Sequence, residues 1–314
     1  MAQPANSFST YDAKGIREDL TDVIYNVDPT TTPFFEMCAK TKATATLHEW
    51  QTDTLAAAVS TNAVVEGNDT TVAATGATVR LTNYCQISEK SARTTGTEES
   101  VKKAGRNNEM AYQVVKRTKE LRRDMESSLL ANLAKVAGSD TVARVLAGVP
   151  SWLTTNTSAG AGGSDPTGDG TDARTNGTQR AFTEDLLKTV LASCWDNGGE
   201  PNCVMVGSFN KQKFSGFTGA STRFDKGEDQ KLYAAIDVYV SDFGELKVIP
   251  NRFQQARDGF VFQKDMWAVP FLRPVKNIEL AQTGDSMARL INTEYSLQAK
   301  NEKASGIIAD LTTS

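Results

Sequence analysis

Residues 46–136 decide the fold that this sequence predicts. Residues 46–51 read TLHEWQ, residues 77–84 read ATVRLTNY, and residues 108–136 read NEMAYQVVKRTKELRRDMESSLLANLAKV. The first two segments predict the strands Ala45–Thr54 and Thr78–Ile87 of a hairpin, and the chain between them has only scattered apolar residues. An isolated two-stranded hairpin is marginal in water. We therefore expect a projecting arm that becomes ordered only against a partner.

The third segment predicts one long amphipathic helix. Its apolar residues recur at spacings of three, four or seven and form one stripe, made of Met110, Val114, Leu121, Met125, Leu129, Leu133 and Val136. We expect the helix to run from about Asn108 to Val136, to end at Gly138, and to span roughly 40 Å.

The other face of this predicted helix is mostly basic. It carries Lys116, Arg117, Lys119, Arg122 and Arg123. One interpretation is a solvated face laced with ion pairs, since Glu120, Asp124 and Glu126 stand at helical spacing from these cations. The other is a surface turned toward nucleic acid without sequence readout, because no aromatic residues interleave with the charges.

The remaining segments predict helices and strands in an α+β arrangement. A short N-terminal helix with a narrow apolar stripe precedes the hairpin, and a Gly/Ser-rich exposed loop occupies 154–180. A helix beginning near Thr183, a buried strand at 203–206 and a hairpin at 236–249 follow. The C-terminal stretches 289–299 and 305–311 are expected to form a strand pair.

Composition limits the compartment and the class of protein. The chain has 314 residues and a net charge of −4, which gives no overall attraction to nucleic acid or membrane. No apolar run approaches the roughly 20 residues that span a bilayer, and residues 1–7 have neither the basic start nor the apolar run of a signal peptide. The four cysteines form no CxxC pair, so we expect a protein that folds in a reducing cytoplasm.

Catalytic, metal and cofactor sites are poorly supported by the sequence. The single histidine, His48, lies in a polar strand beside Glu49, and no serine lies in a GxSxG motif. Residues 165–172 faintly resemble a calcium loop but lack its twelfth-position glutamate, so we interpret them as a solvated turn. Gly160–Gly163 follows no strand and opens no helix, which excludes a P-loop there. We expect no enzyme, no metal and no cofactor.

The order of these elements resembles the major capsid proteins of tailed bacteriophages with the Hong Kong 97-type fold. Each similar stretch is short and none is a chemical motif, so the ordered set carries the resemblance across nearly the whole chain. The set consists of Ser9–Leu20, Glu49–Asp53, Gly207–Gln212, Val238–Gly244, Val248–Arg252, Leu272–Pro274, Leu280–Asp285 and Asn301–Ala304.

The resemblance implies a division of the chain and a set of partners. It implies an N-terminal arm at 1–45, an extended loop at 46–94, the spine helix and start of the peripheral domain at 95–180, a mainly axial domain at 181–286, and C-terminal peripheral strands at 287–314. It also implies self-assembly as hexamers and pentamers, with scaffolding, portal and decoration proteins as further partners. The shell would enclose double-stranded DNA, in a virion assembled in the host bacterial cytoplasm.

Two other classes of protein remain open from the sequence. A cytosolic α/β enzyme would use a cleft between residues 181–286 and the rest of the chain, and it would need a convergent acid, base or nucleophile. A phage tail or adhesion protein would fit the Thr-rich composition, and it would form fibres or rings rather than closed shells.

Overall fold

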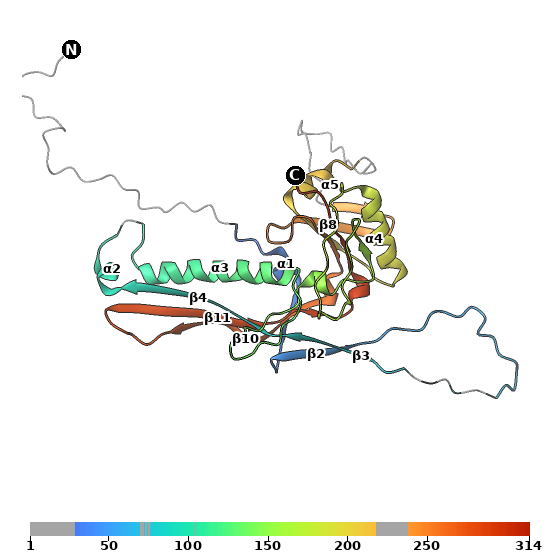
Figure 1. Ribbon diagram of the computed structural model, residues 1–314, viewed down its shortest axis with the longest axis horizontal. Helices are drawn as coiled ribbons and strands as arrows, with labels where there is room; N and C mark the ends of the chain where they lie inside the picture. Colours follow the sequence, from blue (N-terminus) through green and yellow to red (C-terminus); the bar gives the residue numbers. More distant parts are fainter. Residues whose placement is uncertain (1–28, 70–71, 73, 75, 104, 218–237) are drawn as a thin grey trace, which may run out of the picture.

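A computed structural model describes residues 29–69, 72, 74, 76–103, 105–217 and 238–314 of the chain. The N-terminal helix expected around Ile16, Leu20 and Ile24 lies outside these residues. The described part is elongated, with a long sheet and helix at one end, a second sheet with its helices near the other, and a hairpin projecting beyond (Figure 1). The chain combines helices with sheets in which most strand pairs are antiparallel, so the α+β prediction is confirmed.

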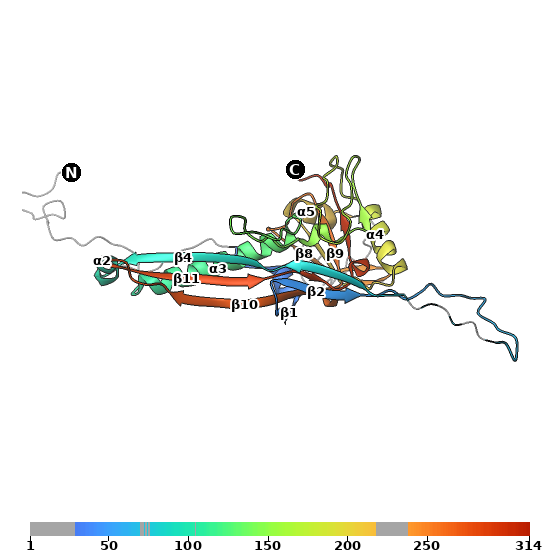
Figure 2. The ribbon, with the colours of Figure 1, turned by 60° about the horizontal axis from the view of Figure 1, so that its bottom comes forward.

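The long sheet supports the longest helix. Its strands follow the order β1-β10-β11-β4, with bounds Ala39–Lys42, Trp267–Glu279, Ser286–Tyr295 and Gln86–Thr95, and the short β12 (Gln298–Ala299) also pairs with β10. Strands β4 and β11 are paired along their whole length, from Ser286 opposite Thr95 to Tyr295 opposite Gln86. Helix α3 (Glu109–Leu130) lies along one face of this sheet (Figures 1 and 2).

The apolar stripe predicted for this helix is confirmed in its central part. Met110, Leu121, Met125 and Leu129 are all buried, and Val114 is half-buried. Asn108 begins the helix, because its side-chain oxygen accepts a hydrogen bond from the backbone N–H of Ala111 at 2.6 Å. Burial of this stripe against the sheet, rather than helix propensity, stabilises the element.

The predicted end of the helix is wrong, because α3 stops at Leu130 and not near Val136. The helix is therefore about 33 Å long. Beyond Ala131 the backbone makes hydrogen bonds to a later segment of the chain in place of helical ones: Gly148 donates to the Leu133 carbonyl at 3.1 Å, and Val136 pairs with Val145. A side chain at Gly148 would lie 1.9 Å from the Ala131 carbonyl oxygen, so only glycine permits this approach.

The second sheet has six strands in the order β5-β13-β9-β6-β8-β7. Their bounds are Thr157–Ser158, Gly306–Ile308, Gly259–Phe262, Cys203–Val206, Gly244–Pro250 and Val238–Ser241. Helices α4 (Glu184–Asp196) and α5 (Ser208–Ser215) contribute to the apolar cluster on one face. A larger cluster on the other face joins this sheet to the long sheet and to α3, so both sheets share one core. The predicted buried strand at 203–206 and the hairpin of β7 and β8 are confirmed.

The expected C-terminal strand pair is wrong. Strand β11 pairs with β10 and β4, whereas β13 pairs with β9 and β5 in the other sheet. The physical reason lies in their environments. Every residue from 304 to 311 is buried, as suits a strand in the interior of a sheet, whereas β11 has exposed and half-buried positions along its length. Residues 296–305 carry the chain from one sheet to the other.

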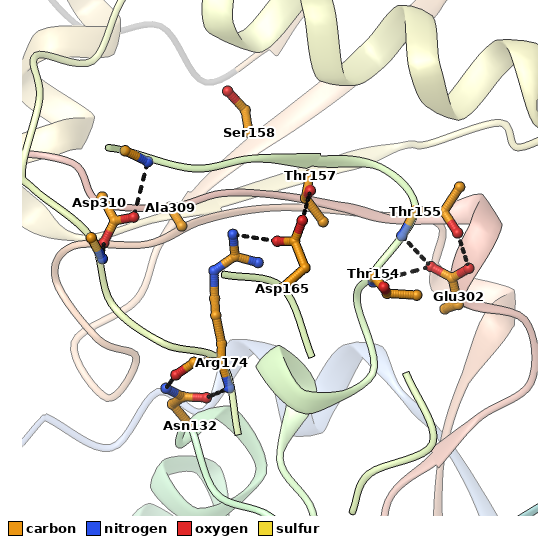
Figure 3. A network of polar contacts seen from close by, with 12 residues as sticks. Asn132, Thr154, Thr155, Thr157, Ser158, Asp165, Arg174, Glu302, Ala309 and Asp310 are labelled. Carbon is orange, nitrogen blue, oxygen red and sulfur yellow. Dashed lines mark hydrogen bonds and ion pairs between the residues drawn. The ribbon is translucent and has the colours of Figure 1, made fainter. Parts of the chain in front are cut away.

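The Gly/Ser-rich stretch 154–180 is an anchored surface segment rather than a free loop. The buried carboxylate of Asp310 accepts hydrogen bonds from the backbone N–H groups of Gly160 (3.0 Å) and Gly177 (2.8 Å), as Figure 3 shows around Asp310. The Arg174 side chain is buried and pairs with Asp165 at 2.6 Å. A Cβ atom at Gly160 would lie 2.1 Å from the Thr178 carbonyl oxygen, so the glycine permits close strand approach.

Candidate functional site: a projecting hairpin and a basic helix face

The projecting hairpin is formed by β2 (Leu47–Thr52) and β3 (Val79–Tyr84). The two strands pair from Leu47 opposite Tyr84 to Thr52 opposite Val79, which confirms the strand positions expected from the sequence. After Cys85 the chain enters β4, which belongs to the long sheet. The two-stranded part of the range 46–94 is therefore limited to residues 47–84.

The root of the hairpin is held by buried polar contacts. The side-chain amide of Asn83 is fully buried; it donates to the Leu297 carbonyl at 2.8 Å and accepts from the Ala147 backbone N–H at 2.9 Å. Lys135 Nζ donates to the carbonyls of Thr82 (2.9 Å) and Asp169 (2.8 Å). Burial lowers the pKa of this lysine. These bonds fix the direction in which the hairpin leaves the body.

Aromatic packing adds to the root. Trp50 is 8% exposed, and its ring lies against Trp152 with the ring centroids 5.2 Å apart. His48 stands next to Trp50 in space, at a centroid distance of 5.8 Å, and burial lowers its pKa. The histidine that the sequence placed in a polar strand is thus part of the hairpin root.

The tip of the hairpin, residues 53–78, has no such support. Its described apolar side chains are strongly exposed: Leu55 is 99% exposed, Val72 90% and Val65 81%. The tip runs out into solvent away from both sheets (Figure 1). From Thr44 to Val79 the sequence contains acidic residues but no Lys or Arg. These apolar side chains are scattered along a projecting arm, where they are open to contact with another protein surface.

The structure divides the basic face of α3 into cations that are exposed without an ion pair and cations that other groups hold. Lys116, Lys119 and Arg122 are exposed and recur every three residues along one side of the helix. Within the described parts of the chain, none of these three forms an ion pair. They are thus available to a polyanion.

Arg117 and Arg123 differ from these three because other groups hold them. Arg117 pairs with Glu120 at 2.7 Å, and the Arg123 guanidinium lies 5.6 Å from the centre of the Phe253 ring. Asp124, expected to pair within the helix, instead binds Lys90 of β4 at 2.6 Å. The interpretation as an ion-paired face therefore suits Arg117, and the interpretation as an open cationic surface suits the other side of the helix.

A polar cavity of about 400 Å³ opens between β4 and the first half of α3. Its lining includes Thr94, Glu98, Glu109 and Arg117. A hydrogen bond from Gln113, together with the neighbouring Arg106, lowers the pKa of Glu109. A general acid at neutral pH needs a raised pKa, so this carboxylate serves as an ion-pair partner.

The described residues offer little for other chemistry. All four cysteines are buried, and burial raises the pKa of their thiols, to about 11 for Cys85 and Cys203. Among the residues the structure describes, no group of three or more His, Cys, Asp and Glu side chains is placed to hold a metal. No helix within those residues is long and apolar enough to cross a membrane.

Several residues that hold the site together were missed by sequence reasoning. Asn83, Lys135 and Asp310 look like ordinary polar residues in the sequence, and Glu126 was counted with the charged face of the helix. All of them bind partners at least 34 residues away in the chain. No local pattern encodes such contacts, although a lone carboxylate between Met125 and Leu129 of an apolar stripe is a weak indication.

Solved structures define the class of protein to which this fold belongs. The chain is similar to the capsid of cyanophage A-1(L), with a TM-score of 0.69 at 12% identity, covering 98% of this chain and 99% of that one. It is also similar to the capsid of the native GTA particle, with a TM-score of 0.62 at 10% identity and 96% and 98% coverage. The fold is the Hong Kong 97-type capsid fold.

The sequence itself places the chain within one family. The model of the SU10 major capsid protein family matches residues 3–312, so the chain belongs to that family of phage major capsid proteins. It is 26% identical to the major capsid protein of Escherichia phage Phieco32 over 344 aligned positions, covering 98% of this chain and 97% of the relative. The resemblance inferred from the ordered set of short stretches is confirmed.

Proposed function

We propose that this chain assembles as hexamers and pentamers into a closed icosahedral shell around the double-stranded DNA genome of a tailed phage. The observation that carries this proposal is the hairpin, whose root is rigid and whose tip exposes apolar side chains. Assembly takes place in the host bacterial cytoplasm. The subunit acts as a building block and not as an enzyme, and it needs no cofactor.

The proposed domain division follows the two sheets. The long sheet with α3 forms the peripheral domain, and the six-stranded sheet with α4 and α5 forms the axial domain around each hexamer or pentamer axis. This arrangement transfers β10 from the 181–286 range to the peripheral domain, and β13 from the 287–314 range to the axial domain. Residues 1–45 act as the N-terminal arm.

The hairpin tip grips a neighbouring copy of the same chain. Burying one Val or Leu side chain of the tip stabilises the contact by about 1.5–3 kcal/mol. Each contact is modest, because the tip loses conformational freedom when it becomes ordered against its neighbour. Repetition over every subunit makes the closed shell stable.

The exposed cations Lys116, Lys119 and Arg122 face the packaged DNA. Their contacts are to phosphates and carry no base specificity, because no aromatic residue lies among these cations and Tyr112, one turn before Lys116, is half-buried with Arg106 over its ring. Arg117 and Arg123 contribute less, since Glu120 and the Phe253 ring already hold them. Scaffolding, portal and decoration proteins complete the set of partners, and no contact with a membrane is part of the proposal.

Electron microscopy and light scattering test the proposal. The purified chain, alone or with the scaffolding protein of its own phage, is expected to give closed particles over some range of salt and protein concentration. Monomers under every condition, or fibres and open rings, would contradict it.

A further inference from the structure

Glu126 occupies an unusual place on α3. Its side chain is completely buried, and its carboxylate accepts three hydrogen bonds. The donors are the backbone N–H of Phe34 (2.8 Å), the backbone N–H of Phe35 (2.7 Å) and the side-chain amide of Asn251 (2.6 Å). These donors come from two other parts of the chain, the short helix α1 (Pro33–Met37) and the turn after β8.

The two backbone donors are groups that helix α1 cannot satisfy itself. The first N–H groups of a helix have no partner within it, and a side chain just before the helix usually accepts from them. Thr32 holds that position, but its side chain makes no such bond and instead contacts Glu36. The carboxylate of Glu126 therefore caps α1 from a position more than 90 residues away.

Helix α1 and strand β1 form a strap, residues 33–42, across the junction of the two sheets. The Phe34 ring lies 5.1 Å from that of Phe262 in the six-stranded sheet and 6.1 Å from that of Trp267 in the long sheet. Strand β1 then pairs with β10 along the edge of the long sheet, from Ala39 opposite Ala268 to Lys42 opposite Phe271.

We infer that Glu126 is a positioning residue that docks this strap onto α3, so that the strap, including the edge strand β1, can be released as a unit while the six-stranded sheet and strands β10, β11 and β4 stay folded. Its carboxylate is the shared acceptor that ties the strap to the helix and to the turn at Asn251. Core packing of Phe34 and the pairing of β1 with β10 hold the strap as well, and Glu126 links it to α3. The inference concerns the docking of the strap within one chain and does not rest on the proposed shell.

The carboxylate of Glu126 and the strap stabilise each other. Burial raises the pKa of Glu126, while its bonds to Phe34, Phe35 and Asn251 oppose that rise, and Glu36 adds to it. In the described part of the chain, no Lys or Arg forms an ion pair with this carboxylate. The strap therefore supplies two of the three donors that stabilise the charged form, and the carboxylate supplies the acceptor that the strap lacks.

Hydrogen exchange measured by mass spectrometry tests this inference on the full-length chain. Glu126→Gln keeps the size of the side chain but replaces one acceptor oxygen with a donor, so at least one of the Phe34 and Phe35 amides loses its partner. We expect peptides covering residues 33–42 to exchange at least about tenfold faster, with peptides from 203–206 and 259–262 unchanged. Asn251→Ala should give a smaller increase in the same peptides, because it removes one donor and keeps the carboxylate.

Glu120→Gln is the matched control, since Glu120 is a partly exposed carboxylate on the same helix that pairs with Arg117. It should leave the exchange of residues 33–42 unchanged. All proteins are compared in one assembly state, established by sedimentation. Unchanged exchange of the strap in Glu126→Gln would overturn the inference. A uniform increase across the strap and both sheets would overturn it too, because Glu126 would then support the whole core.

Discussion

The root and the tip of the hairpin are continuous in sequence, but only the root is packed against the rest of the chain. At the root, Trp50 and Asn83 are buried, and each contacts a segment more than 60 residues away: Trp50 packs against Trp152, and Asn83 accepts a hydrogen bond from Ala147. At the tip, Leu55 and Val72 are almost fully exposed. From this difference we predict that the root governs the stability of the fold and the tip governs assembly, so that each property can be changed without the other.

The largest expected effect comes from removing the tip. Deleting residues 54–75 leaves Asp53-Gly76-Ala77-Thr78 between the paired residues Thr52 and Val79, and Asp-Gly is a favourable turn sequence. We expect a soluble protein with an unchanged melting temperature that forms no closed particles. Calorimetry and electron microscopy measure the two properties. Normal particles from this variant would show that the tip does not grip a neighbour.

A substitution at the root should instead lower the stability of the fold. Asn83→Ala leaves the buried N–H of Ala147 and the carbonyl of Leu297 without their partner, so the free energy of unfolding should fall by about 2–4 kcal/mol. Asn62→Ala at the exposed tip is the control and should change it by less than about 0.5 kcal/mol. Denaturant titration measures both. Equal effects would mean that the root is no better supported than the tip.

The free energy of unfolding should also depend on pH, because of a buried carboxyl group away from the hairpin tip. Burial raises the pKa of Asp258 to about 7, although Arg174 nearby opposes the shift. The folded state therefore binds the Asp258 proton more tightly than the unfolded state does. The contribution of protonated Asp258 to the free energy of unfolding is complete below about pH 4 and is lost as pH rises through about 7. The loss is at most about 4 kcal/mol.

Asp258→Asn removes the titrating group and should flatten that part of the stability profile between about pH 4 and pH 8. Chemical denaturation at several pH values, with the wild-type chain measured in parallel, checks the change in slope. The prediction fails if the two profiles are parallel across this range.

The smallest expected effect concerns the exposed side of α3. Replacing both Lys119 and Arg122 with Ala should reduce the slope of log affinity for duplex DNA against log salt by about 2, because two phosphate contacts are lost. Arg117→Ala should leave the slope unchanged, since Glu120 already holds that guanidinium. Fluorescence anisotropy across a salt series distinguishes the two. Equal slopes in all three proteins would remove DNA from the function of this face.

The sequence predicts the positions of helices and strands better than it predicts which distant segments they pack against or pair with. The amphipathic stripe of α3, the strands of the hairpin and the buried strand at 203–206 follow from local apolar periodicity, and the structure confirms them. The end of α3 and the pairing of the C-terminal strands were wrong, because Gly148 and the interior position of β13 depend on segments distant in the chain. The basic side chains of α3 were found by their spacing, but their division into free and paired groups was not.

By itself, the sequence determined the family, the order of the elements and the presence of an arm without a core pattern. These properties depend on the type and spacing of nearby residues, which act through propensity and periodic burial. Only the tertiary structure decided where the arm becomes rigid, which cations are free and which side chain caps the N-terminal strap. Those outcomes depend on buried hydrogen bonds between residues far apart in the chain, such as Asn83 with Leu297 and Glu126 with Phe34. A buried polar group must find a partner wherever the fold places one, and the local sequence does not record where that is.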